Sequence, residues 1–460
     1  MKLLRALLPL LLLAGAAGMS LAGELIPVPS FSSYEIPETQ NPAARLVWLE
    51  YLDLAALLIG LSLASFLALR VRSRRGLLLL SIASLAWLGF WRKGCVCPIG
   101  AIQNVTLAVC DSTYVIPLTM VAFFALPLIF TLFFGRTFCA AVCPLGAVQE
   151  LVAIRPVKVP GWLEHALGLL AYVYLGLAVL LAATGTAFLI CRYDPFVAMF
   201  RRGGSINMLI LGGCFLVVGL FVGRPYCRYL CPYGAILAPL SRLAKWHMKI
   251  PPEDCIQCRM CQEVCPYGAI QEPTVPQAPA ERVRGRRRLA LLLLLLPLWV
   301  ALGAWLGTRL DVPLAKLHYT VRLAERLRAE ETGSVQGAVE ASDAFRQSGR
   351  RSDELYREAV QLTHRFTYAG GWFGGWVGLV AGVKLIQLSI RRRRSDFRPD
   401  RANCVSCGRC FWYCPSEQAR LGLIEDISNL CENHPGSAAV SAASSGQDAR
   451  APERCQSNQP

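Results

Sequence analysis

Cysteine is the residue type through which this chain could do chemistry. Its 460 residues include 19 cysteines, and 17 of them lie between Cys95 and Cys414 in tight groups. An odd number of cysteines, grouped at short spacings and often followed by proline, favours metal ligation over a set of disulfides. Histidine occurs only five times. The sequence therefore does not predict the paired histidines that a membrane haem needs.

Two runs of four cysteines share the spacing Cys-x2-Cys-x2-Cys-x3-Cys-Pro. This run is typical of bacterial proteins that hold four-iron clusters, because soft thiolate sulfur suits iron and a tight loop can wrap three ligands around one cube. In two-cluster proteins the fourth cysteine of each run serves the other cluster. We therefore predict one cluster on Cys255, Cys258, Cys261 and Cys414, and a second on Cys404, Cys407, Cys410 and Cys265. Zinc is the alternative, although zinc ribbons usually show two isolated Cys-x2-Cys pairs.

A second cysteine pattern lies in an internal repeat. Residues 135–148 (GRTFCAAVCPLGAV) match residues 223–236 (GRPYCRYLCPYGAI), 88 positions later. Each copy follows a pair of apolar segments, so the membrane core reads as a tandem duplication. If the copies pack about a pseudo-twofold axis, four thiols converge near the cytoplasmic surface and would suit a further cluster; thiols without metal are the alternative. These four are Cys139, Cys143, Cys227 and Cys231.

Four more cysteines are predicted near the outer face. They are Cys95, Cys97, Cys110 and Cys191. They are candidates for an outer redox centre, and disulfides are an equally physical interpretation because the outside is oxidising. Cys214 falls within an apolar segment and is expected to pack as a small apolar side chain.

The composition excludes an ordinary soluble protein. Hydrophobic residues make up 54% and charged residues 17% of the chain, whereas soluble domains carry about 25% charged residues. About 20 apolar residues in a helix span a bilayer. Candidate spans lie at 52–70, 76–91, 115–134, 167–190, 206–223, 289–306 and 371–390.

Arginine clusters predict the orientation of these spans. The formal net charge is +16, and arginines concentrate at 70–75, 282–288 and 391–394. Because these clusters flank apolar segments, they indicate cytoplasmic loops rather than a nucleic-acid surface. An even number of crossings must then separate 70–75 from 282–288, which favours keeping the short span at 76–91. Both four-cysteine runs fall on the cytoplasmic side, although 138 residues separate them.

The predicted fold is an all-α polytopic membrane protein of six or seven transmembrane helices, with a split cytoplasmic two-cluster ferredoxin-like α+β domain. Residues 1–22 read as a signal peptide or an uncleaved anchor. The predicted order continues with a periplasmic linker at 23–50, a membrane core at 51–223 with Cys-x3-Cys-Pro motifs at 139–144 and 227–232, the first ferredoxin half at 224–281, a span at 289–306, a periplasmic helical segment at 307–370, a span at 371–390, the second ferredoxin half at 395–430 and a disordered tail at 435–460.

Together these motifs resemble the NosR/NirI group of membrane polyferredoxins, and NapH-type quinol dehydrogenase subunits share the arrangement. The resemblance covers about residues 50–425. It implies electron transfer across or along the bacterial inner membrane toward a periplasmic acceptor, which in NosR-like members serves nitrous oxide reductase or its maturation. The family's cluster ligands map onto the cysteines of the two four-cysteine runs, and its paired membrane cysteines map onto the repeat.

The chain departs from that group in two ways. NosR-type proteins carry a periplasmic flavin-binding domain, whereas about 26 residues separate the signal from the first span here, too few for a domain. Flavin is therefore not expected in this chain, although a separate flavoprotein or the quinone pool could supply electrons. The long spacer between the four-cysteine runs is the second departure. The resemblance favours an electron-transfer subunit; the alternatives are a quinol dehydrogenase subunit and a redox-sensing regulatory or maturation factor.

Overall fold

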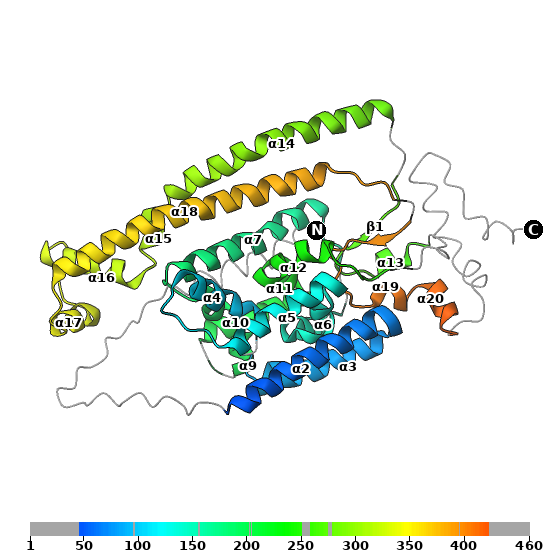
Figure 1. Ribbon diagram of the computed structural model, residues 1–460, viewed down its shortest axis with the longest axis horizontal. Coiled ribbons are helices and arrows are strands. Elements are labelled where there is room, and N and C mark those ends of the chain that lie inside the picture. Colours follow the sequence, from blue (N-terminus) through cyan, green and yellow to red (C-terminus); the bar gives the residue numbers. More distant parts are fainter. Residues whose placement is uncertain are drawn as a thin grey trace, which may run out of the picture.

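The structure is a computed structural model that describes residues 46–94, 97–154, 157–201, 203, 205–250, 258–274, 278–394 and 396–422. The predicted signal peptide, most of the linker at 23–50, the end of the second ferredoxin half and the tail lie outside these residues. So do Cys95 and Cys255. The described part is mostly helical, and the sheet found in it has two short strands (Figure 1).

Long apolar helices run along the longest axis of the molecule (Figure 1). Four helices in the described part are long and apolar enough to cross a membrane: α2 (Val47–Phe66) with its continuation η2 (Leu67–Val71), α7 (Gly161–Ala183), α14 (Pro279–Thr308) and α18 (Ser352–Ser389). Three shorter apolar helices accompany them: α4 (Pro98–Cys110), α5 (Leu118–Phe134) and α10 (Ile206–Gly219). The predicted second span forms α3 (Arg74–Ser84) and η3 (Leu85–Trp91).

Several helix bounds differ from the predicted spans. The seventh span was expected to begin at residue 371, but α18 runs unbroken from Ser352. The fourth was expected at 167–190, whereas α7 begins at Gly161 and ends at Ala183. Helix α4 was not predicted, because its apolar stretch is interrupted by Gln103 and Asn104. Apolar length alone does not show where a helix continues into water or ends at a turn.

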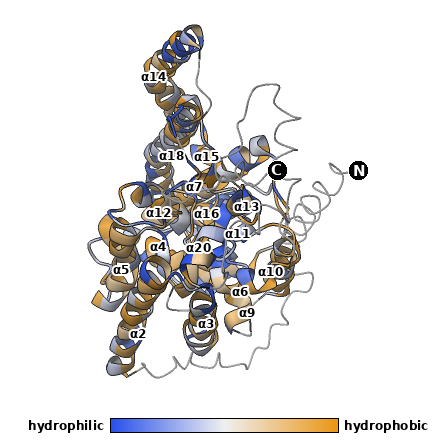
Figure 2. Ribbon diagram, turned by 90° about the vertical axis from the view of Figure 1, so that its right-hand side faces the viewer, coloured by the Kyte–Doolittle hydropathy of each residue, from blue (hydrophilic) through white to orange (hydrophobic). Residues whose placement is uncertain are grey.

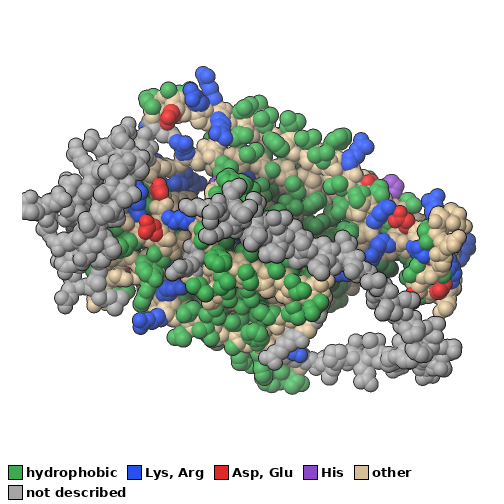
Figure 3. Space-filling model, turned by 180° about the vertical axis from the view of Figure 1, so that it is seen from behind, with side chains coloured by type: hydrophobic (Ala, Val, Ile, Leu, Met, Phe, Trp, Pro, Cys, Tyr) green, Lys and Arg blue, Asp and Glu red, His purple; other side chains and the backbone are tan. Residues whose placement is uncertain are grey.

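The outer surface of the long helices is hydrophobic. Figure 2 shows apolar residues on the helices around the outside, and Figure 3 shows a broad hydrophobic surface between two charged ends. Large apolar side chains such as Ile59, Leu79 and Leu294 are exposed there. In water such a surface would be unstable, so the chain is a membrane protein.

The two ends of the molecule differ in structure. At one end lie α15 (Asp311–Ala315), α16 (Tyr319–Glu331) and α17 (Glu340–Gln347), within the predicted helical segment. At the other end lie α13 (Met260–Glu263), β1 (Ile270–Gln271), β2 (Arg398–Pro399), α19 (Arg409–Trp412) and α20 (Pro415–Arg420) (Figure 1). Between them, the first repeat copy lies in η4 (Phe138–Val142) and α6 (Pro144–Val152), and the second in α11 (Pro225–Tyr229) and α12 (Pro232–Arg242). Two short helices, α8 (Leu189–Tyr193) and α9 (Val197–Arg201), precede α10.

The two segments that carry the four-cysteine runs meet in one small sheet. Strand β1 pairs antiparallel with β2, with Ile270 opposite Pro399. The Thr274 amide donates to the carbonyl of Arg394 at 3.0 Å, which extends the contact toward α14 and α18. Segments 138 residues apart are thus joined by backbone hydrogen bonds.

The helical hairpin of α14 and α18 brings these segments together, because β1 precedes α14 and β2 follows α18. The two helices touch through glycines. A Cβ on Gly307 would collide with the carbonyl of Gly370, and a Cβ on Gly374 would collide with that of Gly303. Small residues at four-residue spacing let transmembrane helices approach closely. The Gly-x3-Gly spacing was readable in the sequence, but the prediction did not use it.

Replacing Gly374 by alanine is expected to destabilise the hairpin. Alanine favours a helix over glycine by about 1 kcal/mol, but overpacking against backbone costs about 1–3 kcal/mol, so the net effect is a lower unfolding midpoint. The matched control is Gly285→Ala on α14, where a Cβ meets no atom within 4 Å. Thermal unfolding in detergent should show a lower midpoint for G374A and an unchanged or higher midpoint for G285A. Equal midpoints in both variants would show that the glycine contact does not hold the hairpin.

Candidate functional site

The recurring Cys-Pro pairs place thiols at the starts of helices. Cys97, Cys143, Cys231 and Cys414 are the N-cap residues of α4, α6, α12 and α20, and a proline follows each. Proline suits the first position of a helix because its missing N–H would have no partner there. The free N–H groups of a helix start favour negative charge. In α12 the amide of Gly234 donates to Sγ of Cys231 at 3.3 Å.

The two repeat copies bring their four cysteines together, as the pseudo-twofold interpretation requires. We call Cys139, Cys143, Cys227 and Cys231 the thiol quartet. Burial raises the pKa of the Cys143 thiol well above its ordinary value, and interaction with the other three members raises it further. The Gln149 amide donates to Sγ of Cys227 at 3.3 Å. Hydrogen bonds to sulfur are a means by which proteins tune iron–sulfur sites.

Two buried arginines face the thiol quartet. Arg224 is 1% exposed and Arg136 is 8% exposed. Arg224 is paired with Glu150 at 3.2 Å, whereas no carboxylate in the described part of the chain accepts a bond from Arg136. Its Nη1 donates to the carbonyl of Ala402 at 2.9 Å, and its Nη2 lies 3.9 Å from Sγ of Cys139. A buried cation needs a compensating charge, so this position fits a thiol quartet that carries negative charge.

A cavity lies between the segments that carry the four-cysteine runs. Four of its lining residues are Cys265, Cys404, Cys407 and Cys410, and we call it the four-thiol cavity. Burial raises the pKa of Cys410 well above its ordinary value, and interaction with Cys404, Cys407, Cys265 and Cys261 adds to the rise. In a four-iron cube each thiolate binds a different iron, so the ligands must surround a space rather than meet at a point. The described residues hold no group of three His, Cys, Asp or Glu side chains that could bind a single metal ion.

The remaining ligands predicted for the other cluster are partly described. Cys261 is buried on α13, which packs against α19. Cys258 lies two residues before α13 and is half-buried, and Cys414 lies between α19 and α20. Cys255 lies outside the described residues. This site therefore adjoins the four-thiol cavity through Cys261 and Cys410.

The thiol quartet and the four-thiol cavity are close neighbours. Tyr267, Ala269 and Val405 form a buried cluster, and Cys139, Cys265, Cys404 and Cys407 all pack against it. The Arg74 guanidinium donates to the carbonyl of Cys407 at 3.2 Å. We call the two segments that carry the four-cysteine runs the ferredoxin segments. Their sulfur site and that of the membrane core thus share one buried interior.

A further pair of cysteines, Cys97 and Cys191, lies within electrostatic range of one another. A Cβ on Gly100 would lie 3.3 Å from Sγ of Cys191. Burial raises the pKa of Cys97 to about 12, and interaction with Asp194 and Cys191 adds to the rise. Cys143 is also within electrostatic reach of Cys97. The structure does not bring Cys110 to this pair, because it lies at the opposite end of α4, about 20 Å along the helix axis.

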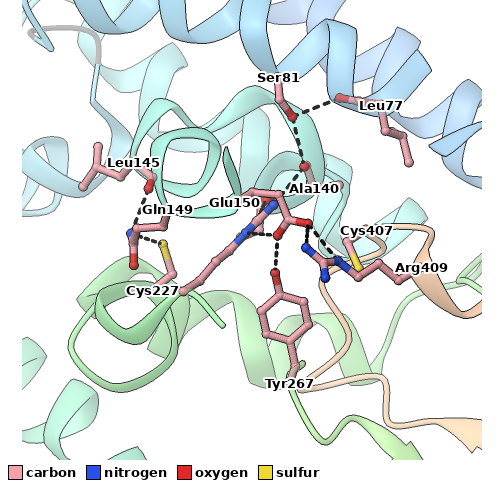
Figure 4. Close-up of polar contacts among 12 residues, drawn as sticks. Leu77, Ser81, Ala140, Leu145, Gln149, Glu150, Cys227, Tyr267, Cys407 and Arg409 are labelled. Atoms are coloured by element: carbon pink, nitrogen blue, oxygen red, sulfur yellow. Dashed lines mark hydrogen bonds and ion pairs between the residues drawn. The ribbon is translucent and has the colours of Figure 1, made fainter. Parts of the chain in front are cut away.

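Sequence reasoning missed a charged network around Glu150, on α6. Its carboxylate accepts from Arg409 at 2.8 Å and from the Tyr267 hydroxyl at 2.7 Å, and Figure 4 shows it between these two side chains. Arg224 and Arg74 lie 3.2 and 3.3 Å away. Burial alone would raise the pKa of Glu150, but Arg224, Arg409 and the Tyr267 hydrogen bond outweigh it and lower the pKa to about 2. Of its members, the sequence marked only Arg224, through the Gly-Arg pair that opens both repeat copies.

These sites define a class of protein, a membrane iron–sulfur electron-transfer protein, and comparison with known sequences supports it. Residues 116–162 and 205–251 each match a family described as a 4Fe-4S binding domain. Residues 248–271 match a second family with the same description. The first of these families covers the thiol quartet, and the second covers the first four-cysteine run.

Within that class the chain is similar to NosR/NirI-like polyferredoxins, as its motifs predicted. It is 33% identical to the protein NirI of Paracoccus denitrificans over 144 residues, 28% of this chain and 21% of NirI. It is 33% identical to the regulatory protein NosR of Pseudomonas aeruginosa over 146 residues, 28% of this chain and 20% of NosR. The protein YccM of Escherichia coli is 28% identical over 161 residues, 31% of this chain and 44% of YccM. The chain thus spans less than half of each of these relatives, and no solved structure matches it.

Proposed function

We propose that this protein passes single electrons between a cytoplasmic or quinone-pool donor and a periplasmic partner. The observation that supports this most directly is the order of its sulfur sites. The four-thiol cavity adjoins the thiol quartet through Cys139, and the quartet reaches toward Cys97 and Cys191 through Cys143. The series leads from the ferredoxin segments into the membrane core.

We assign Cys404, Cys407, Cys410 and Cys265 to one [4Fe–4S] cluster, because these four thiols line one cavity. Cys258, Cys261 and Cys414, with Cys255, are assigned to the other. A bound cluster supplies one-electron redox chemistry. The chain's own residues hold the ligands apart, exclude water from the cavity and place the two ligand sets side by side.

The thiol quartet is the candidate for a third cluster. Its support is the convergence of four thiols, two of them buried and two half-buried, the hydrogen bonds that two of them accept, and the buried cation of Arg136 beside them. Inert packing thiols would leave that cation without a compensating charge.

The orientation follows from the arginine clusters. Arg72 is paired with Glu417 of α20 at 2.8 Å, so the arginine-rich loop at 70–75 lies against the ferredoxin segments. Residues 282–288 and 391–394 adjoin the same end. Because arginine-rich loops remain in the cytoplasm, we assign this end to the cytoplasm and the end with α16 and α17 to the periplasm of a bacterial inner membrane. The likeness to NosR and NirI makes a nitrous oxide reductase system the first place to seek the partner.

Regulation is the second candidate function, because the similar NosR protein is described as regulatory. The same clusters would then sense the redox state of the cell rather than carry a steady flow of electrons. Deletion of the gene distinguishes the two functions. Loss of a partner enzyme's activity with normal expression of that enzyme would support electron transfer. Loss of its expression with electron flow intact would support regulation.

Iron content is the first test of the proposal. The protein would be purified anaerobically in detergent, iron and labile sulfide would be measured per chain, and EPR spectra would be recorded after reduction. About eight irons would support two clusters, and about twelve would add one on the thiol quartet. Zinc without labile sulfide would contradict the proposal.

A further inference from the structure

The Glu150 network joins the membrane core to both ferredoxin segments. It consists of Glu150, Arg74, Arg224, Arg409 and Tyr267. Glu150 is on α6, two residues after the first repeat copy, and Arg224 belongs to the second copy and immediately precedes α11. Tyr267 and Arg409 come from the first and second ferredoxin segments. One carboxylate therefore receives hydrogen bonds or ion pairs from four separate parts of the chain (Figure 4).

The partners of this carboxylate also contact the sulfur sites. Arg224 donates to the carbonyl of Cys139 in the thiol quartet. Arg74 donates to the carbonyl of Cys407 at 3.2 Å, and Arg409 and Tyr267 line the four-thiol cavity. The network therefore lies between the quartet and the cavity and touches both.

The charges of the network do not cancel. Three guanidinium groups surround one carboxylate, which leaves an excess of two positive charges in a buried region. A positive charge near a redox site stabilises its more negative, reduced form, and the effect is strong where water is excluded. Glu150 therefore limits the positive potential that the three arginines create at the neighbouring sulfur sites.

We propose that Glu150 is a positioning residue that fixes the ferredoxin segments against the membrane core and lowers the reduction potential of the cluster site in the four-thiol cavity. This inference rests on the proposed function, because it requires a cluster in the four-thiol cavity. It adds a determinant of the direction of electron flow, since the potential of one site relative to the next decides which one keeps the electron.

The test is a redox titration of the clusters, followed by EPR, in the purified full-length protein. In Glu150→Gln the side chain keeps its shape but loses its charge. The reduction potential of the cluster ligated by Cys404, Cys407, Cys410 and Cys265 is expected to rise so that the ratio of reduced to oxidised form increases at least tenfold, or about 59 mV for a one-electron couple. Arg409→Gln removes a positive charge from the same network and should lower that potential.

The matched control is Glu330→Gln. Glu330, on α16 at the other end of the molecule, has a side chain 6% exposed, as Glu150 has, and is paired with Arg326 and Arg346. Its loss should leave the potentials unchanged. General loosening of the fold would not shift the two potentials in opposite directions. If one variant folds poorly, the presence or absence of the expected shift in the other still tests the role of Glu150.

The outcomes separate this inference from the function on which it rests. If the wild-type protein contains reducible clusters but E150Q and R409Q leave the potentials at the wild-type value, or shift them in the same direction, the role assigned to Glu150 is wrong and electron transfer stands. If the wild-type protein contains no clusters, both fail.

Discussion

Replacing Cys265 by serine is expected to remove the cluster ligated by Cys404, Cys407 and Cys410, and to leave the cluster of its own run in place. The physical reason is that Cys265 lines the four-thiol cavity with those three residues. The chain changes direction at the proline that follows Cys265, so this fourth cysteine lies apart from the loop that holds the first three cysteines of its run. The variant should lose about four irons per chain.

A comparison of single variants tests which cysteines share a cluster. EPR spectra of reduced Cys265→Ser and Cys404→Ser should lack the same signal, although 138 residues separate the two positions. Cys258→Ser and Cys414→Ser should both lack the other signal. Cys214→Ser, on α10 and outside every cysteine group, is the control and should keep both. If Cys265→Ser instead shares its loss with Cys258→Ser, each run binds its own cluster and the exchanged pairing is wrong.

The grouping of Cys265 with the first three cysteines of the second run around one cavity is the part of the site that sequence reasoning could reach. Spacing fixes which thiols can share a loop, and proline after the last cysteine indicates a change of direction. The predicted partners are found around one cavity because β1 and β2 pair only when α14 and α18 return to the same end. The arginine clusters at 282–288 and 391–394 had indicated that return.

The Glu150 network could not be predicted in the same way. Its members lie on five segments far apart in the chain, and a glutamate among apolar residues has no spacing that marks its partners. Asp53 is similar: it lies within the first span, fully buried, and is paired with Arg92 at 2.6 Å. Buried ion pairs of this kind depend on tertiary packing, because only the fold decides which distant charge is near. The matched Arg136 and Arg224 were visible in the repeat, but their roles differ because, among the described residues, only Arg224 has a carboxylate partner.

The outer cysteines show a third limit. Cys95, Cys97, Cys110 and Cys191 were grouped because the predicted topology placed all four near one face; Cys95 lies outside the described residues. The structure makes residues 98–110 a helix, which separates Cys97 from Cys110, while Gly100 leaves room for Cys191 beside the start of that helix. An unrecognised helix of 13 residues thus divides the group. Sequence patterns that place residues at the same depth do not place them side by side.

Replacing Cys143 by serine is expected to interrupt electron flow across the protein while both ferredoxin clusters remain. Cys143 belongs to the thiol quartet, which lies between the four-thiol cavity and the Cys97–Cys191 pair. If the quartet holds a third cluster, the variant should lose about four irons, leaving about eight. The flow itself can be followed in proteoliposomes that enclose an impermeant oxidant such as ferricyanide, with a reductant supplied outside. Its reduction rate should fall to that of liposomes without protein.

Another cysteine of the membrane core provides the control for this variant. Cys110→Ser is the matched control, because Cys110 is also a cysteine of the membrane core but lies exposed at the far end of α4. It should keep both the iron content and the rate. If Cys143→Ser also keeps both, the quartet consists of packing thiols and Arg136 must obtain its compensating charge from another group. If iron falls but the rate does not, the third cluster exists and lies off the path of the electrons. Only the joint loss of iron and rate makes the repeat, with its two Cys-x3-Cys-Pro motifs, the part of the chain that carries electrons into the membrane.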